Sequence, residues 1–312
     1  MKPLKPKTLA KGDTIGILAP ASGGSAEGAE QGIEWLKEQG FQVKLGKSVA
    51  GQYGFLSASD EVRADDLHQM FSDPHIDAIL CLRGGYGSMR LLDRINFHVI
   101  GANPKIFIGY SDITALHLAI LQRTGLITFH GPMAASDMGN NIPDYSKDAL
   151  FQAILSGKAI GRILNPPSTP PPVCLSPGTA KGILTGGNLT LITATLGTPY
   201  EIDTRGKILF LEEVAEAPYR IDRMLTQLLL AGKLQSAAGI VLDVFAGCDE
   251  EAQTVTFSVE EVLRERLGSL TLPVLSGLYF GHTADKATLP LGVTATLDST
   301  AGELVITESA TK

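Results

Sequence analysis

The sequence predicts an α/β fold, with an N-terminal, mostly parallel sheet flanked by helices and a smaller C-terminal α/β domain rich in β-structure. Three observations lead to this prediction. Short apolar runs alternate with helix-like segments through the first half of the chain, a pattern typical of parallel sheets covered on both faces. A proline-rich stretch then interrupts the alternation, and strand-like segments dominate the end of the chain.

The first half supplies strands and helices in turn. Strands are expected in "DTIGILAP", "FQVKLG", "IDAILCL" and "KIFIG", and helices in "AEGAEQGIEWLKEQG", "SDEVRADDLHQMFS", "GSMRLLDRI" and "ITALHLAILQRTG". Gly40 is a suitable residue to end the first helix, and Ser59 or Asp60 to begin the second. The ends of such strands form the sheet edge at which open parallel sheets build their sites.

The stretch "NPPSTPPPVCLSP" marks a change in the chain. It holds six prolines in 13 residues, and proline can continue neither a helix nor a central strand. We therefore expect an N-terminal domain over residues 1–164, an extended linker over 165–177, and a C-terminal domain over 178–312.

The second half is less regular. "KGILTGGNLTLITATLG" is expected to form a strand, a Gly-Gly turn and a helix, and "GKILFLEEV" and "AAGIVLDVFAG" are expected to be strands. Apolar residues at helical spacing predict an amphipathic helix in "YRIDRMLTQLLLAGKL". Ser258 and Glu261 have the spacing of a capping box at the start of "SVEEVLRERLG". The remaining segments, "LPVLSGLYF", "GVTATLDST" and "GELVITES", look like β-structure.

Composition and charge exclude several classes of function. Hydrophobic residues make up 44% of the 312, and the net charge is -7, which argues against nucleic acid as a partner. Apolar runs fall short of a membrane helix, and the N-terminus lacks the apolar core of a signal peptide. Cys81, Cys174 and Cys248 lie far apart, so neither a disulfide framework nor a zinc site is expected. G-x-G-x-x-G and Walker spacing are absent. We expect a cytoplasmic protein without metal or cofactor.

The stretch "IGYSDITALH" places Ser111 where an apolar strand meets a helix. A serine at such a turn can be a nucleophile, as in the G-x-S-x-G elbow, although Ile113 stands where the second glycine is expected. Serine is also an ordinary helix N-cap. Taken alone, this turn favours the cap.

A nucleophilic serine needs a base and an acid that orients it. Of the six histidines, His282 and His130 lie at strand ends, with His282 in the loop of "LYFGH", whereas His68 and His117 fall in helical patterns and are expected to be structural. Glu212 ends the apolar strand "ILFLE", and Glu213 should point to the opposite face.

The turn "RGGYG" follows another buried strand. Gly84 and Gly85 would let backbone N–H groups approach a ligand, as in an anion nest or an oxyanion hole. A tight strand-to-helix turn is the alternative.

Six stretches appear along the chain in one order: "FLSASDEVRADDLHQMFSDPHIDAILCLRGGYGSMRLL", "IGYSDITALH", "TFHGPM", "GGNLT", "ILFLEEVAEAPYRIDRMLTQL" and "GLYFGH". In that order they resemble the LD-carboxypeptidases of serine-peptidase family S66, also called muramoyltetrapeptide carboxypeptidases. The resemblance implies a triad of Ser111 as nucleophile, Glu212 as acid and His282 as base. It further implies an oxyanion hole made by the backbone N–H groups of Gly85 and Asp112.

The activity implied by the resemblance is removal of the terminal D-alanine from a murein tetrapeptide, through an acyl-enzyme, in cytoplasmic recycling of wall peptides. The partner would then be a small peptide. Two alternatives remain: a related S66 peptidase that hydrolyses a microcin C-like peptidyl-nucleotide, and a non-catalytic module that binds a peptide or a sugar phosphate. The substrate-binding residues and the oligomeric state, a homodimer included, stay open.

Overall fold

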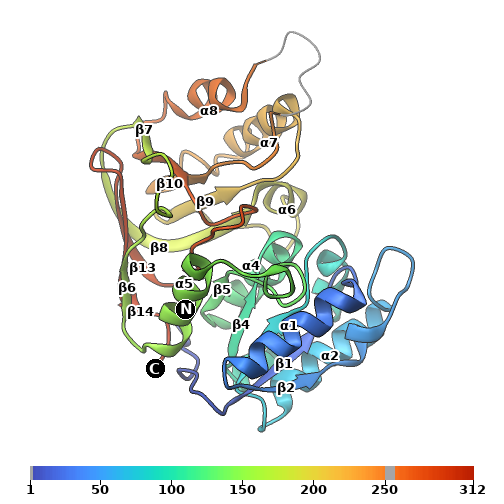
Figure 1. Cartoon of the computed structure of the whole chain (residues 1–312). Coiled ribbons are helices and arrows are strands. Elements are labelled where there is room, and N and C mark those ends of the chain that lie inside the picture. Colours follow the sequence, from blue (N-terminus) through green and yellow to red (C-terminus); the bar gives the residue numbers. More distant parts are fainter. Residues whose placement is uncertain (1–2, 250–256) are drawn as a thin grey trace. The chain divides into compact units, whose positions relative to one another are not determined.

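A computed structural model describes residues 3–249 and 257–312 (Figure 1). The chain packs as two compact units, and neither is one continuous segment. Unit 1 consists of Met1–Lys158, Thr288–Gly292 and Ser309–Lys312. Unit 2 consists of Ala159–Ala287 and Val293–Glu308.

Unit 1 is built on a six-stranded sheet with the order β12-β5-β4-β3-β1-β2. Its strands are β1 (Thr14–Leu18), β2 (Gln42–Leu45), β3 (Ala78–Cys81), β4 (Ile106–Gly109), β5 (Thr128–His130) and β12 (Leu289–Leu291). β1 to β5 pair in parallel, and β12 joins the edge of β5 in the antiparallel direction. The mostly parallel N-terminal sheet is therefore confirmed.

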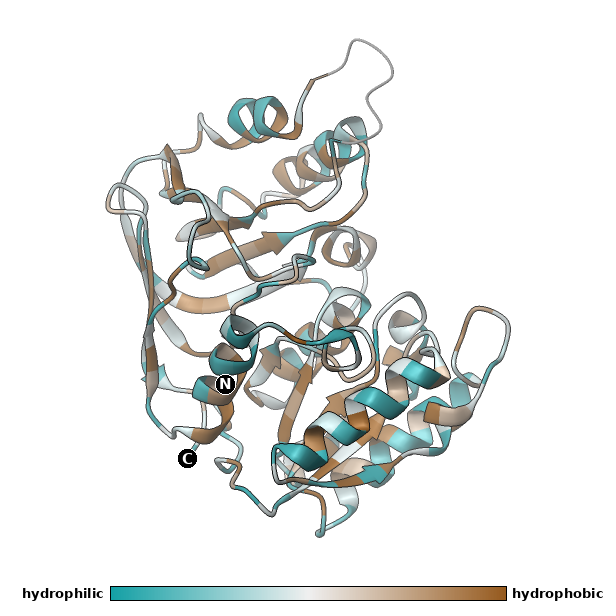
Figure 2. Ribbon diagram, viewed as in Figure 1, coloured by the Kyte–Doolittle hydropathy of each residue, from teal (hydrophilic) through white to brown (hydrophobic). Residues whose placement is uncertain are grey.

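The helices of unit 1 are α1 (Ala26–Glu38), α2 (Asp60–Ser72), α3 (Phe97–Ala102), α4 (Thr114–Thr124) and α5 (Asp144–Leu155). Three of them, α1, α2 and α4, begin and end near the residues that the sequence predicts, whereas α3 and α5 were not predicted. Ser59 caps α2 by accepting the N–H of Val62. The predicted helix in "GSMRLLDRI" is instead a 3-10 helix, η2 (Ser88–Arg94). In Figure 2 apolar residues on α1 alternate with hydrophilic ones, as expected of a helix that covers a sheet.

Unit 2 contains an eight-stranded sheet with the order β6-β14-β13-β8-β9-β10-β11-β7. Its strands are β6 (Ala159–Arg162), β7 (Val173–Ser176), β8 (Thr179–Asn188), β9 (Ile208–Glu212), β10 (Gly239–Asp243), β11 (Val274–Leu278), β13 (Thr294–Asp298) and β14 (Glu303–Ser309). The four central strands β8 to β11 are parallel, and antiparallel strands extend the sheet on both sides. A second α/β unit rich in strands is thus present.

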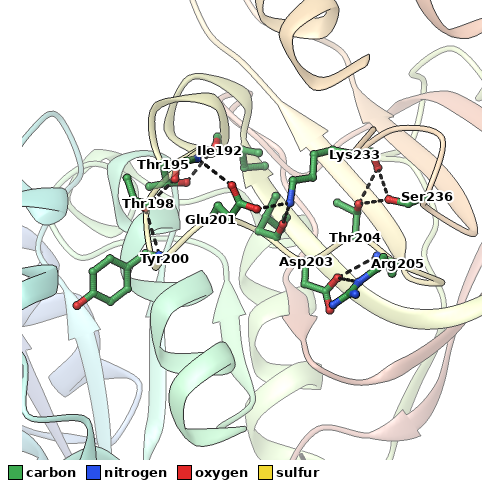
Figure 3. Close-up of polar contacts among 12 residues, drawn as sticks. Ile192, Thr195, Thr198, Tyr200, Glu201, Asp203, Thr204, Arg205, Lys233 and Ser236 are labelled. Atoms are coloured by element: carbon green, nitrogen blue, oxygen red, sulfur yellow. Dashed lines mark hydrogen bonds and ion pairs between the residues drawn. The ribbon is translucent and has the colours of Figure 1, made fainter. Parts of the chain in front are cut away.

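The helices of unit 2 are α6 (Leu189–Ala194), α7 (Pro218–Leu230) and α8 (Val259–Leu267). The capping box predicted for α8 is confirmed, because Ser258 and Glu261 each bond the other's backbone N–H. Figure 3 shows how two loops of this unit are tied together: Lys233 donates to Glu201 Oε1 at 2.8 Å and to the carbonyl of Ile202 at 2.8 Å. Among the described residues, no helix has the length and apolar character needed to cross a bilayer.

The proline-rich stretch contributes to the sheet of unit 2. Its last part forms β7, which pairs with β11 at the sheet edge, where missing N–H donors are tolerated. The chain passes from unit 1 to unit 2 between Lys158 and Ala159, ahead of the predicted linker at 165–177. The division into an N-terminal domain that ends at residue 164 and a C-terminal domain that begins at residue 178 stays a prediction.

The predicted Gly-Gly turn is wrong. β8 runs without interruption through Gly186 and Gly187, whose φ angles are 147° and 139°. Glycine is needed because the neighbouring backbone is very close: a Cβ at Gly186 would overlap the carbonyl of Phe210 on β9. The glycines therefore allow two strands to approach, which a sequence reading cannot separate from a turn.

Replacing Gly186 with alanine is expected to lower the free energy of unfolding by about 3 kcal/mol, through overlap with β9 and backbone strain. Gly197→Ala is the matched control, because Gly197 has a φ of 77° and nothing within 4 Å of the added Cβ. That variant should lose only about 1 kcal/mol, from left-handed strain. Urea denaturation of both variants measures the difference, and equal losses would show that contact with β9 is not the cause.

Candidate active site

Ser111 lies in a strained turn at the end of β4. It is the first residue of the 3-10 helix η3 (Ser111–Ile113), and its φ of 64° is in the left-handed region. A non-glycine residue held there costs about 1–3 kcal/mol, and such strain is concentrated at functional sites. The N-cap of α4 is Ile113, and no side chain caps that helix. The reading of Ser111 as a helix cap is therefore wrong.

The missing second glycine of the elbow has a physical explanation. A Cβ at Gly109 would lie 3.0 Å from two carbons of Ile113 and 3.2 Å from Cys81 Cβ. Glycine at 109 thus makes room for the isoleucine side chain that stands at the second glycine position. The turn keeps the left-handed serine although its sequence departs from G-x-S-x-G.

The glycine turn after β3 lies directly beside Ser111. A Cβ on Gly84 would be 2.9 Å from Ser111 Cβ, 3.1 Å from its Oγ and 3.4 Å from the backbone nitrogen of Asp112. Gly85 has a φ of 99°, and a Cβ there would meet Ser22 Oγ at 2.5 Å. The structure therefore brings together Ser111, Asp112 and the "RGG" turn, all within unit 1.

Buried polar contacts hold these loops in place. The Asp112 carboxylate accepts the N–H of Ser88 at 2.8 Å, and the Ser88 hydroxyl donates to the Asp112 carbonyl. Burial raises the pKa of Asp112, and the Ser88 bonds oppose the rise. The fully buried guanidinium of Arg63 donates to the carbonyls of Pro20 and Gly87, which joins the loops after β1 and β3. The sequence prediction missed Arg63 and Ser88.

Glu212 and His282 form a hydrogen-bonded pair in unit 2. Glu212 is the last residue of the wholly buried strand β9, and its side chain is 0% exposed. His282 follows β11, and its Nδ1 lies 2.6 Å from Glu212 Oε2. Because a carboxylate only accepts, Nδ1 carries the proton and Nε2 of the neutral ring can take up another.

The environment of His282 favours its charged form. Burial lowers the pKa of His282, but the hydrogen bond and the negative charge of Glu212 outweigh burial, and the pKa is raised overall. A buried carboxylate also stabilises the imidazolium that forms when the ring accepts a proton. The pair thus has the arrangement of a general base and the acid that orients it.

Glu213 points away from this pair, as the alternation of a strand predicts. Its carboxylate accepts bonds from Asn188 and from the N–H and hydroxyl of Thr190, at the start of α6. Burial raises the pKa of Glu213. Glu213 therefore anchors α6, while Glu212 contacts the histidine.

The other histidines have different surroundings. His117 is fully buried; its Nε2 lies 2.8 Å from the Gly109 carbonyl, and burial lowers its pKa to about 3. His130, the alternative base, is buried on β5 and packs edge-on against Tyr110 with ring centroids 5.8 Å apart. Among the described residues, no group of three or more Asp, Glu, His or Cys side chains is arranged to hold a metal ion.

Comparison with known proteins gives matches over both halves of the chain. The family model described as the LD-carboxypeptidase N-terminal domain matches residues 15–131, and that of the LD-carboxypeptidase C-terminal domain matches 181–297. A probable murein peptide carboxypeptidase of Bacillus subtilis is 44% identical over 97% of this chain and 94% of its own length.

Solved structures with the same fold include two kinds of protein. The muramoyltetrapeptide carboxypeptidase of Oxalobacter formigenes is 31% identical, with a TM-score of 0.82 over 95% of this chain and 99% of that one. MccF in complex with glutamyl sulfamoyl guanosine is 28% identical, with a TM-score of 0.91 over 99% of this chain and 100% of that one. The predicted α/β fold class is confirmed.

Proposed function

The chain belongs to the LD-carboxypeptidase family of serine peptidases, and on that premise we propose that it removes the terminal D-alanine from murein tetrapeptides. The observation that carries the proposal is the hydrogen bond of 2.6 Å between Glu212 and His282, because it prepares the imidazole as a general base. The substrate assignment is supported by the B. subtilis relative, which is named a probable murein peptide carboxypeptidase.

The proposed chemistry is acyl transfer to serine. Nε2 of His282 takes the proton of Ser111 Oγ as this oxygen attacks the carbonyl carbon of the L-centre before the terminal D-alanine. The backbone N–H groups of Gly85 and Asp112 stabilise the oxyanion, an effect that usually changes turnover by about 10²–10³-fold for each donor. His282 then gives the proton to the leaving amine of D-alanine.

Water completes the cycle. Water attacks the acyl carbon while His282 takes its proton, and His282 passes that proton to Ser111 Oγ as the ester bond breaks. The shortened peptide leaves with a new carboxyl group, and the serine hydroxyl is restored. Glu212 keeps its negative charge throughout, holds Nδ1 protonated and stabilises the imidazolium. The reaction needs neither a redox partner nor a cofactor, and its cytoplasmic place in recycling wall peptides is part of the same proposal.

A second candidate is hydrolysis of an aminoacyl nucleotide. The likeness to MccF, which was solved with glutamyl sulfamoyl guanosine, favours this alternative over the binding module. Both reactions use an acyl-transfer site, and they differ in the leaving group. The identity of 44% to the murein relative, against 32% to the MccF of Escherichia coli, supports the murein substrate as the first candidate.

The direct test is a comparison of two substrates. We expect the purified chain to release D-alanine from L-Ala-γ-D-Glu-diaminopimelate-D-Ala, followed by mass spectrometry, and to cleave glutamyl sulfamoyl adenosine much more slowly. The all-L peptide with terminal L-alanine serves as the control for stereochemistry. Faster cleavage of the sulfamoyl nucleotide would transfer the assignment to the second candidate.

A further inference from the structure

Asp243 is a second buried carboxyl group next to the Glu212–His282 pair. It is the last residue of β10, and only 1% of it is exposed. β10 pairs in parallel with β9, with Leu242 opposite Leu211, so the next residues along these strands are Asp243 and Glu212. The two carboxyl groups therefore lie at the carboxyl-terminal ends of two neighbouring parallel strands.

The Asp243 carboxyl group holds the turn that carries His282. Its Oδ1 accepts the N–H of Phe280 at 2.8 Å and the N–H of Gly281 at 3.1 Å. These are the two residues directly before His282. Two hydrogen bonds to consecutive backbone N–H groups fix both the position and the direction of the chain as it enters the histidine.

Gly281 shows how closely this turn packs on both acids. A Cβ at that position would overlap Asp243 Oδ2 and would lie 2.8 Å from Glu212 Cβ. Glycine before the histidine is therefore required by the space that the two acids occupy. Among the described residues, Asp243 Oδ2 is buried without a hydrogen-bond partner.

The protonation of Asp243 is consistent with a structural role as a hydrogen-bond acceptor. Burial raises the pKa of Asp243 to about 7; the negative charge of Glu212 adds to the rise, and the N–H groups of Phe280 and Gly281 oppose it. A second full negative charge beside Glu212 is thereby disfavoured. A neutral carboxyl group keeps an oxygen that accepts both N–H bonds.

We propose that Asp243 is the positioning residue of the catalytic base: it anchors the turn at Phe280 and Gly281 and so holds the His282 imidazole against Glu212. The inference rests on the proposed function of His282. It assigns Asp243 no contact with substrate. Its contribution is through geometry, and a displacement of about 1 Å at a reacting group can cost about 10²-fold in rate.

Two substitutions at this position separate geometry from charge. Asp243→Asn keeps an oxygen that can accept the N–H groups of Phe280 and Gly281, and it removes the negative charge. Asp243→Ala removes the acceptor. The matched control is Asp298→Asn, because Asp298 also ends a strand and accepts a backbone N–H, that of Ala301, at 2.9 Å. It lies on β13, which β8 and β9 separate from β10 in the sheet.

For Asp243→Ala we expect kcat for D-alanine release to fall about 10²-fold with little change in KM. Asp243→Asn should restore most of that loss, to within about tenfold of the wild type, and Asp298→Asn should match the wild type. Circular dichroism and thermal melting give the folded fraction, by which each kcat is corrected. Rescue by asparagine is the result that general destabilisation would not produce.

The pKa of His282, followed by NMR titration and assigned with His282→Gln, gives a second readout. The charged groups that act on His282 are Glu212, Glu213 and Lys286, and the bond to Glu212 raises its pKa. Loosening the turn weakens that bond, so the pKa should fall in Asp243→Ala and stay near the wild-type value in Asp243→Asn.

Two results overturn the inference. One is wild-type kcat in Asp243→Ala after correction for folded protein. The other is an equal loss of kcat in the alanine and asparagine variants while both stay folded. If Asp243→Ala does not fold, a loss of about 10²-fold in a folded Asp243→Asn overturns the inference instead. A wild-type chain that leaves murein peptides intact refutes the proposed function instead, and the pKa of His282 still tests Asp243.

Discussion

Replacing Ser111 with alanine is expected to abolish D-alanine release, with a fall in kcat of about 10⁶-fold. The acyl-enzyme cannot form without the hydroxyl group, and in any residual hydrolysis water itself must attack the peptide carbonyl. Stability should change little, because Ser111 is not a helix cap and alanine meets the same left-handed strain at a φ of 64°. Single-turnover assays with the tetrapeptide and thermal melting measure the two effects.

Ser59→Ala is the matched control for this variant. Ser59 is a serine that does cap a helix, since it accepts the N–H of Val62 at 3.4 Å at the start of α2. Its loss should lower the free energy of unfolding by about 1 kcal/mol and leave turnover unchanged. The two serines thus give opposite results. Full turnover in Ser111→Ala would reject Ser111 as the nucleophile, whereas a wild-type chain that hydrolyses no peptide would favour the binding module.

Glu212→Gln is expected to lower kcat by about 10⁴-fold, because a glutamine can hold the wrong tautomer of His282 and cannot stabilise its charged form. The pH profile should also move. The base acts when neutral, so turnover rises with pH through the pKa of His282, which Glu212 raises. Without the negative charge that pKa falls, and the rise should occur at lower pH. Measurements of kcat/KM against pH for both proteins test this shift.

The neighbouring acid provides the control for Glu212. Glu213→Gln makes the same chemical change one residue along the strand, where the carboxylate bonds Asn188 and Thr190. That variant should lose stability and move the pH profile much less than Glu212→Gln does, because Glu213 raises the pKa of His282 through its charge alone, without a hydrogen bond to the ring. If the pH profile moves in Glu213→Gln and stays unchanged in Glu212→Gln, then Glu213 orients His282 and the proposed role of Glu212 is wrong.

Much of the fold could be predicted because it depends on local pattern. Buried strands such as β4 and β9 are short apolar runs, and α2 and α8 begin at serines whose capping spacing is visible in the sequence. The Gly-Gly pair in β8 was predicted wrongly because its cause is the carbonyl of Phe210, a residue distant in sequence. Close approach between strands leaves the same glycine signal as a turn.

The candidate site shows the same division. Glu212 could be selected because it ends an apolar strand, and the "GIVLD" of β10 carries an identical signal for Asp243 that the sequence prediction did not use. The left-handed backbone of Ser111 could not be derived, since serine is common at ordinary caps. The role of Arg63 could not be predicted either. An arginine in a helical pattern is normally exposed, and only the structure shows that carbonyl groups of two distant loops accept its hydrogen bonds.

The segments that make up unit 1 are synthesised at different times. β12 pairs with β5, and Lys312 exchanges backbone bonds with Pro6 and Thr8, so unit 1 includes segments that follow almost all of unit 2 in the sequence. A ribosome releases β5 well before β12, and during that interval one edge of the sheet lacks its partner strand. The sheet of unit 1 is therefore completed only after β12 has been made, and a fragment that ends in the proline-rich stretch would keep the bare edge permanently.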